Sequence, residues 1–180
     1  IEEHTVLWAI NGLAVAATPE IIRELAERAD VSAVRLDATV VLAQPKVAAA
    51  AEPEWNLEMV GAPDLWASGH TGVGVVVAVL DSGVDVLHPD LADRYRGGDN
   101  SWFDPYGEHP TSPSDLAGHG TATMGVMVGR DAGGTDIGVA PLAQWIAVKI
   151  FDDRGNATAT AIHLGFQWLL DPDGDPSTPD

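Results

Sequence analysis

The sequence feature that most constrains the fold is an apolar run, Val75 to Leu80, that stops abruptly at Asp81-Ser82-Gly83. An apolar run followed by turn-forming residues predicts a strand buried on both faces, and we place this strand at Gly72 to Leu80. Strands of this kind belong to parallel sheets covered by helices on both sides. The rest of the chain therefore has to supply further strands and the helices that cover them.

The residues after position 55 alternate between patterns typical of helices and of strands. Helices are predicted at Pro63 to Ser68, His119 to Val128 and Thr158 to Leu170, and a second buried strand at Gln144 to Phe151. A long polar loop is expected at Ala92 to Ala117. Alternating strands and helices predict an α/β fold with a parallel sheet.

The residues before position 44 follow a different pattern. A strand is predicted at Val6 to Ala17, a helix from Pro19 to Ala29 with Thr18 as its N-cap, and a second strand at Val31 to Leu42. These elements would form a small open α+β unit. Residues Gln44 to Glu54, rich in alanine and containing two prolines, are expected to link this block to the next.

The charge of the chain excludes two classes of partner. Nine Lys and Arg against 27 Asp and Glu give a formal net charge of −18, whereas nucleic-acid backbones and anionic membranes attract positive charge. A hydrophobic fraction of 46% allows a packed core, and the absence of cysteine excludes thiol catalysis and disulfides. The longest apolar run is far shorter than the ~18 residues of a membrane span. Because the sequence begins with Ile1, we expect it to be part of a longer protein.

Two residues are candidates for catalysis. Asp81 ends the buried strand, and open α/β sheets bind ligands at the carboxyl ends of their strands. His119 begins a helix between Gly118 and Gly120, which leave space around its imidazole ring. A carboxylate that accepts a hydrogen bond from one ring nitrogen leaves the other nitrogen free as a general base, so we predict a contact between Asp81 and His119. The alternatives are a turn cap for Asp81 and a helix cap or surface position for His119.

Longer motifs surround and follow these two residues. Val77 to Asp85, continued by His88 to Leu91, resembles the aspartate motif of subtilisin-like serine peptidases. Gly118 to Thr121 is similar to the histidine motif of that family. Gly138 to Pro141 and Ala147 to Lys149 resemble the segment that comes next in these enzymes. The motifs occur in the family's order, and the loop with Trp102-Phe103-Asp104 most resembles the bacillopeptidase F branch.

The resemblance implies a parallel-sheet subtilisin-like catalytic domain, with residues 55–180 as its N-terminal part, in an extracellular serine endopeptidase that acts on polypeptides. In that family the aspartate orients the histidine, which deprotonates a serine in a Gly-Thr-Ser motif far downstream. No serine of this sequence stands in such a motif: Ser32, Ser68, Ser82, Ser101, Ser112, Ser114 and Ser177. We therefore expect the nucleophile to lie beyond this chain and the 180 residues alone to be inactive.

The resemblance also gives a role to the first block. Residues 1–45 would be part of an inhibitory propeptide that assists folding, and residues 46–54 would be the linker. The processed bond would lie near Ala43-Gln44. The alternative is a non-catalytic inhibitor or chaperone module joined to an incomplete catalytic domain.

Substrate-binding residues are implied only in part. The segment Gly155-Asn156-Ala157 resembles the edge that pairs with an extended peptide through main-chain hydrogen bonds. Phe151 and Ile162 would line side-chain pockets, with plain core packing as the alternative. Ala159 replaces a bulky residue often found over one of these pockets, so we expect that pocket to accept a large side chain.

Two positions depart from the family or match it only in part. Ala122 stands where the family usually has histidine, which we interpret as a packing change. Asp90 matches a calcium ligand of the family, but Ala132 lies where an amide ligand is expected. Asp131 and Asp136 offer replacement oxygens, with a solvated acidic loop as the alternative. The chemistry itself would require no cofactor.

Two other functions compete with the peptidase interpretation. A metal-dependent hydrolase would draw on five side chains: Asp81, Asp85, His88, Asp90 and His119. The sequence has no His-x-x-x-His pair to support it. A dinucleotide-binding domain would need a third glycine, which is missing after both Gly72-x-Gly74 and Gly118-x-Gly120.

Overall fold

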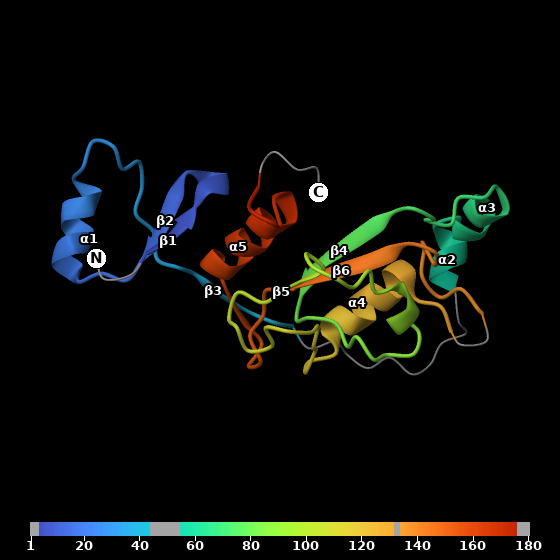
Figure 1. Cartoon of the computed structure of the whole chain (residues 1–180). Coiled ribbons are helices and arrows are strands. Elements are labelled where there is room, and N and C mark those ends of the chain that lie inside the picture. Colours follow the sequence, from blue (N-terminus) through green and yellow to red (C-terminus); the bar gives the residue numbers. More distant parts are fainter. Residues whose placement is uncertain (1–3, 44–54, 132–133, 176–180) are drawn as a thin grey trace.

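A parallel sheet lies at the centre of the computed structural model, which describes residues 4–43, 55–131 and 134–175 (Figure 1). The strands are β4 (Val76–Asp81), β6 (Gln144–Lys149) and β5 (Trp102–Phe103), hydrogen-bonded in the order β4-β6-β5 with every pair parallel. The predicted α/β arrangement is therefore confirmed. The expected linker at 46–54 lies outside the described residues.

Helices cover both faces of this sheet: α4 (His119–Val128) one face and α5 (Ala159–Leu170) the other. Side chains alternate along each strand, and Val79 pairs with Ala147 in the core beneath α4. Leu80 and Val148 point the other way, and a methyl group at Gly165 of α5 would lie 3.0–3.2 Å from their side chains. The absence of a side chain at Gly165 thus lets α5 pack closely against the sheet.

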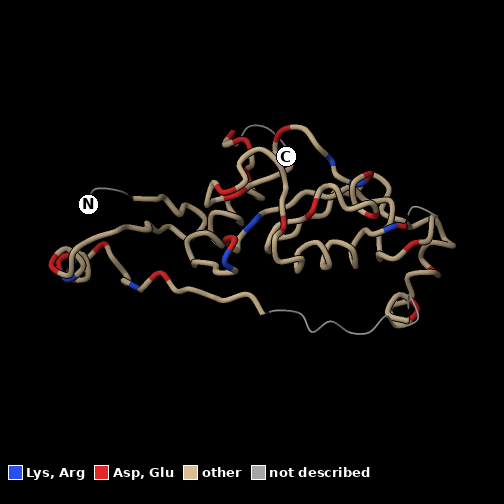
Figure 2. The backbone as a smooth tube through the Cα atoms, turned by 90° about the horizontal axis from the view of Figure 1, so that it is seen from below, with Lys and Arg blue, Asp and Glu red and all other residues tan. Residues whose placement is uncertain are grey.

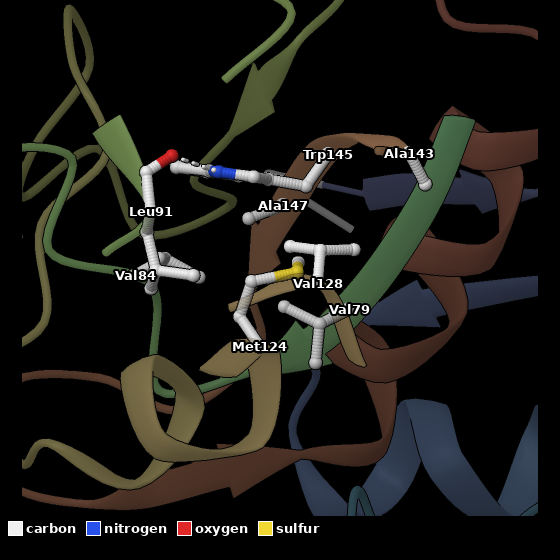
Figure 3. Close-up of a cluster of buried hydrophobic side chains, with 8 residues drawn as sticks. All are labelled: Val79, Val84, Leu91, Met124, Val128, Ala143, Trp145 and Ala147. Atoms are coloured by element: carbon white, nitrogen blue, oxygen red, sulfur yellow. Dashed lines mark hydrogen bonds between the residues drawn. The ribbon is translucent and has the colours of Figure 1, made fainter. Parts of the chain in front are cut away.

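The main core lies between α4 and the sheet (Figure 3). It is made of apolar side chains that are at most 7% exposed: Val79, Val84, Leu91, Met124, Val128, Ala143, Trp145 and Ala147. Trp145 is fully buried, and its indole N–H donates to the carbonyl of Leu91 at 2.8 Å. The largest side chain of the core therefore has its one polar atom satisfied.

The predicted elements of the second block differ from the observed ones mainly at their ends. Helix α4 has the predicted bounds, whereas β6 ends two residues before Phe151. Helix α5 starts one residue late because Thr158 is its N-cap, with its hydroxyl accepting from the N–H of Ala161 at 3.0 Å. Helix α3 (Ala62–Ala67) confirms the predicted short helix, whereas α2 (Trp55–Met59) was not predicted. The prediction of a loop at Ala92 to Ala117 is wrong in part, because the 3-10 turn η2 (Ala92–Arg94) and strand β5 lie within it.

The prediction of one strand from Val6 to Ala17 is wrong. The segment is a hairpin of β1 (His4–Leu7) and β2 (Gly12–Val15), joined by the 3-10 turn η1 (Trp8–Ile10). Asn11 adopts the left-handed conformation with φ 50°, and Gly12 follows it. An Asn-Gly pair between apolar runs favours a turn. Here the chain reverses over Trp8 to Asn11, and Gly12 is the first residue of β2, opposite Leu7.

The rest of the first block is also less regular than predicted. Helix α1 (Pro19–Ala26) ends three residues early, and the strand expected at Val31 to Leu42 is reduced to β3 (Thr39–Val41). β3 pairs antiparallel with β7 (Asn156–Thr158), more than a hundred residues further along the chain. Strand structure in this region therefore forms only where a partner from the second block is present.

Candidate active site

Asp81 lies at the carboxyl end of β4, on the face covered by α4. Alternation along the strand gives Asp81 the same side as Val79 and the opposite side to Leu80. Asp81 is 7% exposed, and its Oδ1 accepts a hydrogen bond from the N–H of Ser82 at 2.7 Å. The strand thus presents a nearly buried carboxylate to the first turn of α4.

His119 is the first residue of α4 and faces that carboxylate. Its Nδ1 lies 2.7 Å from Oδ1 and 2.9 Å from Oδ2 of Asp81. The imidazole side chain is 34% exposed, whereas the Asp81 side chain is 9% exposed. The contact predicted from the sequence is therefore present, and the ring remains partly open to solvent.

Glycine at position 120 allows this approach. A Cβ there would collide with the carbonyl oxygen of Gly83 and would lie 3.0 Å from the Cβ of Asp81. The backbone N–H of Gly120 donates to the hydroxyl of Ser82 at 3.0 Å. The first turn of α4 is thus in direct contact with the end of β4, which explains the need for glycine after His119.

Asp115, which was not among the predicted site residues, connects the end of β4 with the start of α4. Its Oδ1 accepts hydrogen bonds from the Ser82 hydroxyl at 2.8 Å and from the N–H of Gly118 at 2.9 Å. Its Oδ2 accepts from the N–H and the hydroxyl of Thr121 at 2.9 and 2.6 Å. Burial raises the pKa of Asp115, but the hydrogen bonds from Thr121, Ser82 and Gly118 outweigh it and hold the pKa below its usual value. The sequence feature that could have identified Asp115 is its position four residues before His119.

A buried cation lies beside the catalytic candidates. Lys149, the register partner of Asp81, is 1% exposed, and its ammonium group donates to the carbonyl of Ser82 at 3.1 Å. It also pairs with Asp153 at 3.1 Å, and Asp153 contacts Nε2 of His109 at 3.0 Å. Burial alone would raise the pKa of Asp153, but the hydrogen bonds from Lys149 and His109 lower it below its usual value. The buried charge of Lys149 is therefore paired and hydrogen-bonded.

The segment expected to bind substrate is occupied by the first block. β7 contains Asn156 and Ala157, and Val40 of β3 is the register partner of Ala157. The N–H of Leu42 donates to the carbonyl of Gly155 at 2.8 Å. Residues 39–42 thus lie on this edge in the way an extended peptide would.

Comparison with known proteins agrees with this geometry. A model described as Subtilase family matches residues 72–175, which include both Asp81 and His119. The chain belongs to the subtilase family.

Individual relatives cover different shares of this subtilase chain. Bacillopeptidase F of Bacillus subtilis (strain 168) is 35% identical over 187 aligned residues, which take in 92% of this chain and 13% of the relative. The major intracellular serine protease of the same organism is 40% identical over 115 residues, and its subtilisin E is 36% identical over 116. These two matches take in 64% of this chain and 34% and 29% of the relatives. The subtilase chain thus spans about a third or less of the length of these relatives.

The pocket residues implied by the family are only partly enclosed. Phe151 and Ile162 are half-buried, and so is Ala159 at the start of α5. The N–H of Phe151 donates to the carbonyl of Asp81 at 3.3 Å. Phe151 is therefore connected to the candidate catalytic pair, and its role in a pocket stays a prediction.

Near Asp90, several acidic side chains of this subtilase chain contact other described groups. The Asp90 carboxylate lies 4.0 Å from Nδ1 of His88, and Asp136 pairs with Arg130 at 3.0 Å. One carboxylate oxygen of Asp131 accepts the N–H of Thr135 at 2.7 Å. Within residues 4–43, 55–131 and 134–175, no group of three or more histidine or acidic side chains could hold a metal ion. Calcium binding by these oxygens stays a prediction, and Ala132 lies outside the described residues.

Acidic residues outnumber basic ones throughout this chain. Among the described residues, Asp and Glu are spread along both blocks of the subtilase chain, and the fewer Lys and Arg lie between them (Figure 2). In the part of the chain that the structure describes, no helix has the length and hydropathy needed to cross a bilayer.

Proposed function

We propose that these residues belong to a serine endopeptidase in which Asp81 orients His119 as the general base. The observation that carries the proposal is the contact of both Asp81 carboxylate oxygens with Nδ1 of His119, at 2.7 and 2.9 Å. A carboxylate in this position favours the tautomer with hydrogen on Nδ1 and stabilises the imidazolium. Nε2 is then the basic nitrogen, and it can take the proton of a serine hydroxyl.

The nucleophile would come from outside residues 1–180. Ser82 adjoins Asp81, but its hydroxyl donates to Asp115 and accepts from the N–H of Gly120. The hydrogen bonds of the Ser82 hydroxyl are therefore made to groups other than His119. Residues 1–180 alone are expected to be inactive, because loss of the nucleophile removes most of the rate enhancement.

The first block would act as a propeptide, comprising residues 1–45, that covers the substrate-binding edge. The pairing of residues 39–42 with Gly155 and β7 supports this proposal, since it fills the edge on which an extended polypeptide substrate would lie. We propose that the processed bond lies just after the paired segment, near Ala43-Gln44. The same pairing would also suit a non-catalytic inhibitor module. Both the propeptide and the inhibitor module are expected to inhibit the active enzyme when the first block is added to it separately.

The location of the protein is proposed as extracellular, on the resemblance to secreted members of the family. One relative is named as an intracellular protease, so family membership alone does not decide the compartment. The pocket beside Ala159 is proposed to accept a large substrate side chain.

The mechanism is tested in the longer protein that contains these residues and the serine segment. With peptide substrates, replacing Asp81 by Asn should lower kcat by about 10⁴-fold and replacing His119 by Ala by about 10⁶-fold, while substrate binding persists. His70→Ala is the matched control, because His70 is an exposed histidine before β4. Peptidase activity that survives His119→Ala would remove His119 from the mechanism.

A further inference from the structure

The two edges of β7 have different partners. On one edge, the carbonyl of Gly155 accepts from Leu42, and the N–H of Ala159 donates to Ala38 at 2.9 Å. Backbone groups alternate in direction along a strand, so the carbonyl of Asn156 and the N–H of Thr158 point away from β3. In a wider sheet another strand would pair with this second edge.

No strand lies there among the described residues: the carbonyl of Asn156 accepts the N–H of Asp152 at 2.8 Å, and the side chain of Tyr106 reaches the same edge. The hydroxyl of Tyr106 lies 3.3 Å from the carbonyl of Asn156 and accepts the N–H of Thr158 at 3.3 Å. It also lies 2.9 Å from the carbonyl of Ile150, at the end of β6. The hydroxyl proton of Tyr106 can be donated to the carbonyl of Ile150 or to that of Asn156. Tyr106 therefore connects β7 to the end of β6 in the central sheet.

The loop that carries Tyr106 is itself fixed. The Asp104 carboxylate accepts the N–H of Tyr106 at 2.9 Å and that of His109 at 2.7 Å. Glu108 accepts the N–H of Asp153 at 2.9 Å, and Nε2 of His109 contacts the Asp153 carboxylate. Tyr106 is half-buried, and burial raises the pKa of its hydroxyl, which therefore remains a neutral donor.

We infer that Tyr106 is a positioning residue for substrate binding, because its hydroxyl holds β7 in the extended shape that pairs with a peptide. The inference rests on the proposed function. Tyr106 acts through the backbone of β7, which supplies no atom to the Asp81–His119 contact. Its loss should weaken substrate binding and leave the chemical step unchanged.

Kinetics of Tyr106→Phe in the active, longer protein separate these effects. With a peptide whose residues occupy the positions of Thr39 to Leu42, KM should rise about fivefold and kcat should stay within about twofold. With an ester of a single amino acid, which does not reach β7, neither constant should change. Tyr95→Phe is the control, since the Tyr95 ring packs on Trp145 in the core and lies outside the substrate edge.

Hydrogen exchange on the 180-residue chain gives a second measurement that needs no activity. Tyr106→Phe should speed exchange in β3 and β7 and leave β4 unchanged. Unchanged KM and unchanged exchange, or a fall in kcat alone, would overturn the inference. If the longer wild-type protein cleaves no peptide, the proposed function fails, and the exchange rates still decide the role of Tyr106.

Discussion

At the residue scale, the candidate active site depends on a carboxylate that is not itself in contact with His119. Asp115 connects Ser82 at the end of β4 with Gly118 and Thr121 at the start of α4. These are the two segments that carry Asp81 and His119. Hydrogen bonds to a charged acceptor are stronger than neutral ones, so the ionised form of Asp115 should matter.

Replacing Asp115 by Asn should destabilise the fold by about 2 kcal/mol at neutral pH, since several donors lose a charged acceptor. The pKa of Asp115 is lowered in the fold, so its charge stabilises the protein above the unfolded pKa of about 3.9. This contribution is lost as the pH falls from there through the lower folded pKa. Urea unfolding at several pH values should show a constant difference between wild type and variant above about pH 5, shrinking below about pH 4.

Asp93→Asn provides the comparison for that experiment. Asp93 lies exposed in η2, and its substitution should change stability by less than about 0.5 kcal/mol. A pH-independent difference between wild type and Asp115→Asn would show that the charge of Asp115 is not what stabilises this region.

At the element scale, the contact between α4 and β4 is set by the glycine after the histidine. Gly120→Ala should cost about 1–3 kcal/mol, because a Cβ would collide with the backbone of Gly83 and the helix would have to move. Gly125→Ala, in the same helix, has open space around the new methyl group. It should be neutral or stabilise by up to about 1 kcal/mol. Chemical denaturation of both variants measures the difference, and equal effects would mean that α4 can shift at no cost.

The sequence predicted the elements whose signals are local. The apolar run of β4, the glycines on either side of His119 and the acid at the strand end are each visible within a few residues. The contact between Asp81 and His119 followed from the rule that ligand-binding residues lie at the carboxyl ends of parallel strands.

The elements that depend on distant partners were not predictable in this way. The extent of β3 is decided by β7, and the support from Tyr106 depends on a loop whose path is set by Asp104 and His109. The hairpin at residues 4–15 is a different case, because Asn11-Gly12 was a local turn signal that the apolar run around it obscured.

At the scale of the whole molecule, the first block depends on the second for its order. Among residues 4–43, the buried apolar side chains are those of Leu7 and Leu42, and α1 buries none. The block is held by β3 and by polar contacts to α5, including Gln167, whose side chain donates to the carbonyl of Val6 at 3.3 Å. Asp37 accepts the N–H of Thr160 at 3.0 Å in the first turn of α5.

Hydrogen exchange should therefore report two levels of stability. Amides of residues 4–41 should exchange through local opening, and those of β6 more slowly. Asp37→Ala should speed exchange in the first block and leave β6 unchanged, whereas Glu27→Ala, at the exposed end of α1, should change neither. An equal increase in β6 after Asp37→Ala would mean that the two blocks open as one unit.

The pairing of β3 with β7 has a consequence for competition, because both strands belong to one polypeptide. A separate peptide that binds β7 would have to compete with β3, whose effective concentration at β7 is on the order of millimolar. Diluting the protein would not release β3, because both strands are in the same chain. A single cut between residues 43 and 55 would make the same contact bimolecular, so that its occupancy would fall with dilution. Whether the backbone between residues 43 and 55 is intact would then decide whether the edge of β7 is free, although the contacts between β3 and β7 would be the same in both cases.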